Sequence, residues 1–295
     1  MRCGFTPMRP ARAWWSRSVP SSQSSTSRTA NETMRLFYLL LLAIGGLAAH
    51  AQSARPLEKV LLPIWFRGTV PGAFGASWSV RVIGYNASSQ TVTVIKSPVL
   101  ACNQGPCDRP NAPAQATFTP EPEPTAGTGA FLFIDRDRVD DIHLNLRIQD
   151  VSRQALTWGT EIPVVRARDV FTGPLLLLDV PTDARFRQSL RVYDFDDDIG
   201  REVRLRILSV ESGQGGLPAP PDRLLVDTNL TLTSIRQLHA PGSAEIGWLV
   251  STFPQLTSSE RVRIELTPVT PGLRFWAFVS ITNNETQHVT TITPR

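Results

Sequence analysis

Residues 77–96 read SWSVRVIGYNASSQTVTVIK, and residues 188–209 read QSLRVYDFDDDIGREVRLRILS. In both stretches an alternating run of apolar and polar residues leads into a short polar segment and then into a second alternating run. A period of two residues is typical of a β-strand with one buried face, and Asn, Asp, Ser and Gly between two such runs favour a turn. Each stretch therefore predicts a β-hairpin, and the likeness of the two stretches predicts an internal duplication.

Similar short runs continue on both sides of these hairpins. They occupy residues 59–66, 129–135, 142–150 and 161–167 in the first half of the chain, and residues 175–180, 245–251, 261–269 and 275–283 in the second. Aligned as a repeat, residues 129–135 match 246–252, and residues 144–151 match 262–269. Helical periodicity is almost absent, and only residues 228–239 suit a helical turn as well as they suit a strand.

Six or seven short strands in each half of about 115 residues suit a β-sandwich of immunoglobulin-like size. The expected fold class is therefore all-β, with two tandem immunoglobulin-like β-sandwich modules at residues 52–170 and 174–295. The Cys-Trp-Cys spacing of true immunoglobulin domains is absent, so the strand topology stays open. The Pro-rich segments 109–129 and 212–223 are expected to be connections, because Pro lacks a backbone N–H donor.

Residues 34–51, MRLFYLLLLAIGGLAAHA, have the layout of a secretory signal peptide that is cleaved after Ala51. The apolar run has about a dozen residues, whereas a membrane-spanning helix needs about 20, so no membrane span is expected in the mature chain. Residues 1–33 are rich in Ser and Arg without an apolar period, which predicts disorder. Because Met34 can itself start translation, these residues are either a wrongly assigned upstream extension or an unusually long leader.

Charge separates the leader from the rest of the chain. Six of the 30 Lys and Arg residues and one of the 26 Asp and Glu residues lie within residues 1–51, which leaves 24 basic and 25 acidic residues beyond them. The mature chain is therefore close to neutral. A nucleic-acid-binding domain requires a basic surface, so nucleic acid is not an expected partner.

Two cysteines remain after the leader, and they are spaced CNQGPC at Cys102 and Cys107. In an oxidising compartment a loop this short that contains Gly and Pro favours a disulfide. A metal site would require further soft ligands nearby, and the sequence places none there. We therefore expect a Cys102–Cys107 disulfide that fixes a local loop.

The most acidic stretch follows the first run of the second hairpin. Asp194, Asp196 and Asp198 match the first ligand positions of a calcium-binding loop, but Ile199 and Leu205 stand where that loop requires Gly and Glu. The corresponding turn of the first hairpin, YNASSQ, is uncharged. The stretch therefore predicts a hairpin tip, with a surface calcium site as the alternative, including one that stabilises packing between the modules.

A second acidic group, at Asp135, Asp137, Asp140 and Asp141, is interleaved with arginines, which is typical of a solvated strand end. A glycosidase would need two carboxylates across a cleft, so an acidic group in a concave site beside a Trp would favour sugar chemistry. His143, His239 and His288 have no metal-ligand spacing, and no nucleophile or phosphate-binding motif is present. No catalytic residue is assigned, and no other cofactor is expected.

Tryptophans are the remaining candidates for ligand contact. Trp65 and Trp158 lie near strand ends, where an exposed ring could stack on a sugar or anchor a protein. Trp78, Trp248 and Trp276 lie inside alternating runs, where one face fills the core. We therefore expect ligand stacking at the first two residues and core packing at the other three.

The opening VLLPIWFRGTVPGAFGASW (60–78) and the ending FWAFVSITNNETQHVTTITPR (275–295) resemble secreted bacterial proteins with tandem β-sandwich repeats, a group without an assigned activity. The resemblance implies export and tandem β modules. We expect a secreted or periplasmic, non-catalytic protein with a binding, adhesive or structural role, whose partner is a protein or glycan at the cell surface. The alternative is an extracellular polysaccharide-active enzyme or its carbohydrate-binding accessory.

Overall fold

A computed structural model describes residues 56–96, 111–122, 129–153, 158–196, 200–210, 221–233 and 240–295. Within these residues antiparallel strands predominate, which confirms the all-β fold class. The described residues belong to one compact unit. The expected signal segment at residues 34–51, the segment before it, and the cysteines at positions 102 and 107 lie outside the described residues.

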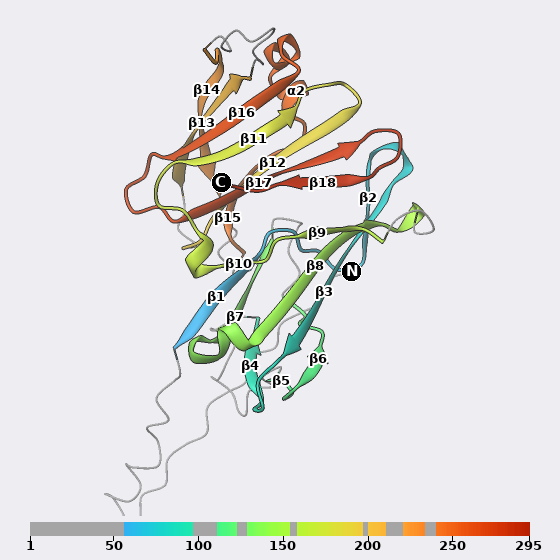
Figure 1. The fold of residues 1–295 in the computed structure, drawn as a ribbon, viewed down its shortest axis with the longest axis vertical. Coiled ribbons are helices and arrows are strands. Elements are labelled where there is room, and N and C mark those ends of the chain that lie inside the picture. Colours follow the sequence, from blue (N-terminus) through green and yellow to red (C-terminus); the bar gives the residue numbers. More distant parts are fainter. Residues whose placement is uncertain are drawn as a thin grey trace, which may run out of the picture. The chain divides into compact units, whose positions relative to one another are not determined.

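The first half, defined as residues 56–170, forms two antiparallel sheets (Figure 1). One sheet has the strand order β10-β1-β7-β4-β5, and its members are β1 (Leu57–Leu62), β4 (Val92–Ile95), β5 (Asn111–Ala112), β7 (Ala130–Asp135) and β10 (Val165–Arg166). The other has the order β2-β3-β8-β9, with β6 also pairing with β3. Its members are β2 (Thr69–Pro71), β3 (Ser77–Asn86), β6 (Ala116–Phe118), β8 (Ile142–Asp150) and β9 (Thr160–Ile162).

The second half, residues 171–295, also forms two antiparallel sheets. One has the order β11-β16-β13-β14, formed by β11 (Leu175–Pro181), β13 (Arg201–Ser209), β14 (Leu224–Leu232) and β16 (Arg261–Pro268). The other, which we call the central sheet, has the order β15-β12-β17-β18. It is formed by β12 (Phe186–Asp194), β15 (Gly242–Ile246), β17 (Phe275–Asn283) and β18 (Val289–Ile292).

Helical segments are few and short within the described residues. They comprise one four-residue α-helix, α2 (Leu249–Thr252), and the 3-10 turns η1 (Ala73–Gly75), η2 (Arg136–Asp141), η3 (Val151–Arg153), η4 (Ala167–Asp169) and η6 (Pro254–Ser258). The predicted strand at residues 245–251 is therefore wrong beyond Ile246, where β15 ends and the helix follows. Leu249 is buried, and its carbonyl accepts the N–H of Phe253 at 2.8 Å, so a helical turn buries the apolar residue.

The strand order repeats between the halves in a way that the sequence alignment did not predict. The order β1-β7-β4-β5 corresponds to β11-β16-β13-β14, and β3-β8-β9 corresponds to β12-β17-β18. The strand β7 (residues 130–135) therefore corresponds to β16 rather than to residues 246–252, and β8 corresponds to β17. The alignment was wrong by one strand here, because short alternating runs resemble one another and only their pairing distinguishes them.

The predicted strand at residues 161–167 is interrupted. Thr160–Ile162 forms β9 in one sheet and Val165–Arg166 forms β10 in the other, so the chain changes sheets at Pro163. Pro has no N–H to donate to a ladder, which favours the break at this point. Residues 228–232, for which the sequence allowed helix or strand, belong to strand β14.

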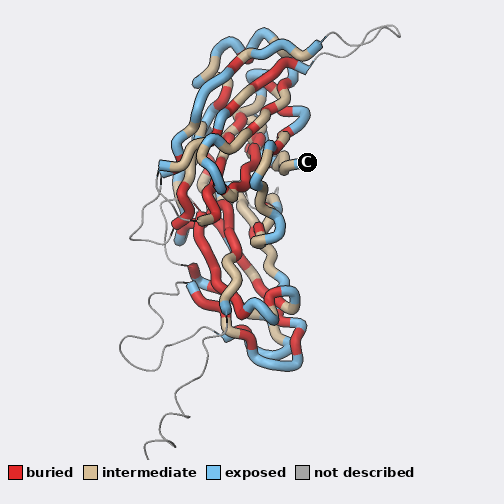
Figure 2. The backbone as a smooth tube through the Cα atoms, turned by 90° about the vertical axis from the view of Figure 1, so that its left-hand side faces the viewer, coloured by how far each residue is buried: buried red, intermediate tan, exposed pale blue. Residues whose placement is uncertain are grey.

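Two clusters of buried apolar residues form the interior, and the first draws residues from both halves. It contains first-half residues such as Leu61 and Phe131 together with Tyr193, Trp276 and Phe278 of the second half. These second-half residues lie on β12 and β17, in the central sheet, and Figure 2 shows the long buried stretches of the chain in red. The two halves are therefore joined by shared core packing as well as by the chain.

Candidate functional site

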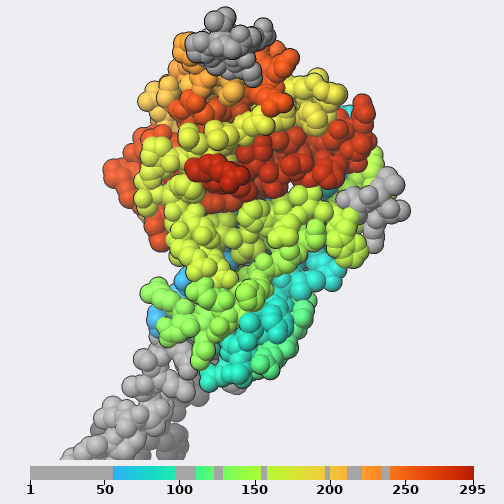
Figure 3. All heavy atoms as spheres, in the orientation of Figure 1, coloured from blue at the N-terminus to red at the C-terminus, as the bar shows by residue number. Residues whose placement is uncertain are grey.

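A cleft of about 620 Å³ lies between the two halves. Its first-half wall is mainly apolar and includes Ile64, Phe66, Val70, Trp78 and Ile148, together with Arg67, which is exposed and lies 3.7 Å from Glu121. Its second-half wall is mainly polar and includes Arg187, Ser189, Arg191, Glu245, Ser280 and Thr282. Beside it, the β17–β18 hairpin (red in Figure 3) lies against β9 of the first half, where Thr160 Oγ1 donates to the carbonyl of Val289 at 2.5 Å.

The cleft arises from a change of residue type along one face of the central sheet. Successive side chains of a strand point to opposite faces, so Tyr193 and Arg187 share a face of β12 that points away from the core of the second half. At one end of this face, Tyr193 pairs with Trp276, and both are buried. At the other end, Arg187 pairs with Thr282, and neither is fully buried.

The aromatic end of this face closes against the first half. Tyr193 and Phe278 are stacked with ring centroids 6.5 Å apart, and Phe278 contacts Trp276 at 5.4 Å. The Tyr193 hydroxyl donates to the carbonyl of Pro63, and burial raises the pKa of this hydroxyl above its ordinary value. Where the aromatic residues give way to Ser189 and the residues beyond it, the contact between the halves opens into the cleft.

Trp78 belongs to the apolar wall and is positioned by the Gly-rich turn that precedes β3. A Cβ atom at Gly72 would lie 2.3 Å from the indole Nε1, so only Gly allows the ring to lie this close to the turn. The turn continues through Phe74 and Gly75, which have φ values of 55° and 74°. The Phe74 ring is 58% exposed at the tip.

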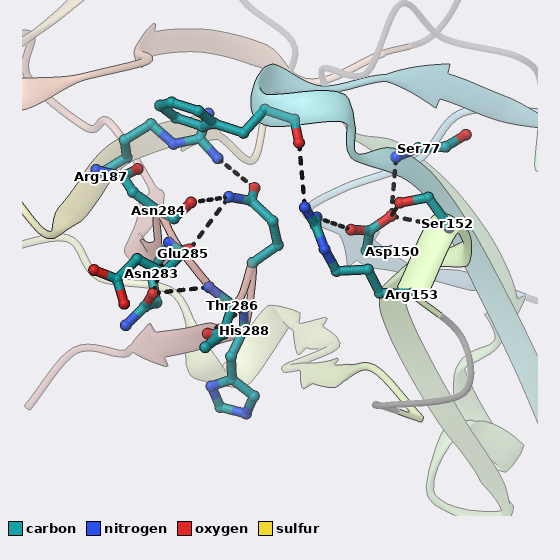
Figure 4. Close-up of polar contacts among 12 residues, drawn as sticks. Ser77, Asp150, Ser152, Arg153, Arg187, Asn283, Asn284, Glu285, Thr286 and His288 are labelled. Carbon is teal, nitrogen blue, oxygen red and sulfur yellow. Dashed lines mark hydrogen bonds and ion pairs between the residues drawn. The ribbon is translucent and has the colours of Figure 1, made fainter.

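A polar network fixes the same turn from β8. Asp150 is buried and accepts from the N–H of Ser77 at 2.9 Å and from the Ser152 hydroxyl at 2.6 Å. Arg153 pairs with Asp150 at 2.8 Å and donates to the Phe74 carbonyl at 3.2 Å (Figure 4). Burial alone would raise the pKa of Asp150, but these hydrogen bonds outweigh it and hold the pKa below its ordinary value.

Arg191 and Glu245 form the charged pair of the polar wall. They lie opposite each other on β12 and β15, and Arg191 Nη2 is 2.7 Å from Glu245 Oε1. The Ser189 hydroxyl donates to the same oxygen at 3.3 Å. Within the described residues, no hydrogen bond reaches Glu245 Oε2, so the pair presents both an acceptor and guanidinium donors at the cleft.

Arg187 differs from Arg191 because no carboxylate of the described residues lies within ion-pair distance of it. Its Nη2 donates to Gln287 Oε1 at 2.9 Å, and its guanidinium carbon lies 5.2 Å from the centre of the Phe74 ring. Its Nε is buried without a hydrogen-bond partner among the described residues. Burial lowers the pKa of Arg187, since no neighbouring anion offsets it.

Gln287 holds Arg187 in place from the turn between β17 and β18. The residue is buried and has a φ of 58°, a conformation that is uncommon outside Gly. Its amide nitrogen donates to the carbonyl of Asn284 at 2.7 Å, which leaves Oε1 to accept from Arg187. Figure 4 shows Arg187 beside the turn residues Asn283 to Thr286.

The aspartates of the acidic turn between β12 and β13 lie outside the cleft lining. Asp194 is buried at the end of β12, and its Oδ1 accepts the N–H of Asp196 at 2.8 Å. Asp196 accepts from Arg274 Nε at 3.0 Å and lies 3.3 Å from Arg201. Burial alone would raise the pKa of Asp196, but Arg274 and Arg201 hold it below its ordinary value. Asp198 lies outside the described residues.

The corresponding turn of the first half has the same local structure. Asn86 is buried at the end of β3, and its Oδ1 accepts the N–H of Ser88 at 2.9 Å, two residues further on. Its amide nitrogen also donates to the carbonyl of Ala112 at 2.9 Å. Asn86 and Asp194 thus perform one task, a side-chain-to-backbone turn of the kind that Asn and Asp favour. The strands that flank each turn do not pair with each other, because β3 and β4 lie in different sheets, as do β12 and β13. The predicted hairpins at residues 77–96 and 188–209 are therefore wrong, and each turn instead connects one sheet to the other. The carboxylate of Asp194 has a structural contact in this turn.

The other acidic group also lies outside the cleft lining. Asp140 pairs with Arg168 at 2.6 Å and Asp141 with Arg138 at 3.4 Å, in and beside η2. Across the part of the chain that the structure describes, no group of three or more His, Cys, Asp or Glu side chains is arranged to hold a metal ion. The pairing of the aspartates with arginines leaves calcium binding at the acidic turn a prediction.

The tryptophans are placed differently from several expectations. Trp65 is only 9% exposed and packs in the first core cluster, so its expected surface position is wrong. Trp158 is 66% exposed, and its role in stacking stays a prediction. Trp276 is buried as expected, whereas Trp248 is 39% exposed at the start of α2 because the predicted strand ends before it. Trp78 lines the cleft, which the sequence did not indicate.

The alternation of residue types along β12 is a sequence pattern that predicts the polar wall. On β12 the residues Arg187, Ser189 and Arg191 alternate with apolar or buried positions, which marks them as one face of a strand. Which surface that face meets depends on the packing of the two halves.

Comparison of the chain with protein-family models, with curated proteins and with solved structures finds no match in any of the three. Among the described helices, none has the length and apolar character needed to span a membrane.

Proposed function

We propose that the chain is an exported, non-catalytic binding protein of the bacterial cell envelope, built from two tandem immunoglobulin-like β-sandwich modules, whose ligand binds in the cleft between its halves. The observation that carries this proposal is the cleft of about 620 Å³ with an apolar wall on one side and a polar wall on the other. Binding sites for small ligands typically occupy about 300–1,000 Å³ and combine apolar walls with a few polar groups.

The composition of the cleft favours binding over hydrolysis. Glu245 is the one carboxylate among the described residues that line it, and it is already paired with Arg191. Hydrolysis of a glycosidic bond generally uses two carboxyl groups across the bond, one as acid and one as base or nucleophile. The acidic groups around Asp140 and Asp196 lie elsewhere, on arginine-paired turns.

The alternative is an extracellular polysaccharide-active enzyme or its carbohydrate-binding accessory. Trp78 opposite the hydroxyl groups of Ser280 and Thr282 supports the accessory in particular. Aromatic rings take up the apolar face of a sugar, and hydroxyl or charged side chains bind its hydroxyl groups. The export step of the proposal is supported by the signal-peptide pattern at residues 34–51 and by the pair Cys102 and Cys107.

The test is a binding screen of the chain from Gln52 onward against glycans and envelope proteins, with variants that fill the cleft. We expect Ser280→Trp to abolish binding of any ligand retained by the unaltered chain, and Thr282→Phe to weaken it. Thr231→Trp, at an exposed position on β14, is the matched control and should bind normally. Retention of the ligand by a folded Ser280→Trp protein, with circular dichroism and melting midpoint as in the parent chain, would contradict the cleft as the binding site.

A further inference from the structure

We propose that the cleft binds an acidic saccharide, with the carboxylate of a hexuronate residue held by Arg187 and the sugar ring lying against Trp78. This inference rests on the proposed function, since it names the ligand class of the same cleft. It is carried by the contrast between the two arginines of the polar wall. Arg191 has a carboxylate partner within the cleft, and Arg187 has none among the described residues.

Arg187 is held as a recognition group rather than as a free surface cation. The Gln287 amide fixes its Nη2 at 2.9 Å, and the Phe74 ring covers the guanidinium at 5.2 Å. Both partners are neutral, so they orient the guanidinium without neutralising it. A half-buried, uncompensated cation favours an anionic ligand, and the planar guanidinium fits a carboxylate through two parallel hydrogen bonds.

Glu245 limits the charge that a ligand can carry. It lies in the same wall as Arg187 and is 43% exposed in its side chain. A phosphate carries a charge of about −1.5 to −2 at neutral pH, and it would be repelled by this carboxylate more strongly than a group with a single charge. The charge pattern of the wall therefore favours a carboxylate over a phosphate.

The remaining polar groups match the hydroxyl groups of a sugar. Each ring hydroxyl both donates and accepts a hydrogen bond. Glu245 offers an acceptor, while Ser189 and Thr282 offer hydroxyl groups that do either. Trp78 on the opposite wall offers an aromatic surface for the apolar face of the ring.

The backbone of the polar wall argues against a peptide bound by strand addition. β12 is paired on both edges, with β15 and β17, and β17 is paired with β12 and β18. A peptide that extends a sheet requires an unpaired edge, whereas most of the polar wall consists of side chains on the interior strands β12 and β17, with Glu245 and Val289 on the edge strands β15 and β18. Recognition in this cleft is therefore by side chains, which suits a saccharide.

The experiment is titration calorimetry of the chain from Gln52 with trigalacturonate and with its fully methyl-esterified form, at low salt and neutral pH. The ester keeps the size of the saccharide and removes its charge. We expect the acid to bind at least about tenfold more tightly than the ester, and Arg187→Gln to weaken acid binding by about tenfold to a hundredfold. Arg187→Lys should lie between the two, and added salt should weaken binding of the acid.

Arg204→Gln is the matched control. Arg204 lies on β13 in the other sheet and pairs with Asp227 at 2.6 Å, so its loss should leave binding of both saccharides unchanged. Equal affinity for acid and ester, or acid binding by Arg187→Gln equal to that of the parent chain, would overturn the inference. Binding of a peptide acid but not of its amide, with no binding of trigalacturonate, would also overturn it.

The cleft-filling variant separates the two proposals. If Ser280→Trp abolishes binding of acid and ester alike while both bind the parent chain equally, the cleft is the binding site and only the carboxylate preference fails. If neither saccharide binds, but another envelope component binds the parent chain and not the Ser280→Trp protein, the acidic-saccharide inference fails and the proposed function stands. If trigalacturonate binds the Ser280→Trp protein as it binds the parent chain, both proposals fail.

Discussion

Replacement of Phe278 by Ala should destabilise the first half although the residue belongs to the second. Phe278 is fully buried and packs in the core cluster of the first half, between Tyr193 and Trp276. Its neighbour Val279 is equally buried but points to the opposite face of β17, into the core of the second half. The two positions therefore test the two cores from a single strand.

Removal of a buried Phe side chain costs about 3–5 kcal/mol of the free energy of unfolding. Removal of the two methyl groups of Val279 costs about 2 kcal/mol, from about 0.8 kcal/mol for each group plus a small cavity. If unfolding in urea has a slope of about 2.5 kcal/mol per M, Phe278→Ala should lower the midpoint by about 1.5 M, and Val279→Ala should lower it by about 0.8 M.

The assay combines urea denaturation with hydrogen exchange followed by mass spectrometry. We expect Phe278→Ala to reduce protection in peptides from β1 and β7 of the first half more than in those from β13 and β16, and Val279→Ala to show the reverse preference. The reasoning is refuted if Phe278→Ala changes the free energy of unfolding by less than about 1 kcal/mol, or if its lost protection is confined to the second half.

Four further predictions concern single polar contacts. Asn86→Ala should lower the free energy of unfolding by about 2–3 kcal/mol in urea titrations, because the amide donates to three carbonyls, of which that of Ala112 is buried. Asp194→Asn should cost less than Asp194→Ala, because Asn keeps the turn-forming acceptor; equal losses would contradict this. The pKa of Asp150 is lowered in the folded protein, so its carboxylate should stabilise the fold above a pH of about 3.8, and this stabilisation should be lost as the pH falls further. Asp150→Asn should remove this part of the dependence of stability on pH. An unchanged pH profile of the variant would argue against this role. Tyr193→Phe should cost about 1 kcal/mol by thermal or urea unfolding, because a carbonyl of the first half loses its donor, and a more stable variant would show that this bond is unimportant.

The two halves show where sequence comparison succeeds and where it fails. The segments around Asn86 and Asp194 form the same kind of turn, but each turn joins two sheets and is not the predicted hairpin. The alignment of the later strands was wrong by one whole strand, so that β7 was aligned with a segment that ends in α2. Asn and Asp at a turn carry a specific local contact, whereas an apolar alternating run fits any strand with one buried face.

The candidate site was less accessible to sequence reasoning than the fold. Trp65 and Trp158 were both expected at the surface because they lie near strand ends, yet only Trp158 is exposed. Arg187 and Arg191 carry no motif, and their importance depends on the wall that faces them. The pairing of Arg191 with Glu245 follows from the order of strands in the central sheet, where β12 lies beside β15; among the described residues Arg187 has no such ion pair.

The sequence by itself determined the all-β class, most strand positions and the turns at Asn86 and Asp194, because alternation of apolar and polar residues and the conformational preferences of Asn, Asp, Gly and Pro act over a few residues. Only the tertiary structure decided which strands pair, that Tyr193, Trp276 and Phe278 are buried by the first half, and that the same sheet face opens into a cleft at Arg187. The physical reason is that a strand pattern records whether a side chain is buried, whereas the partner that buries it is set by contacts between residues distant in the sequence.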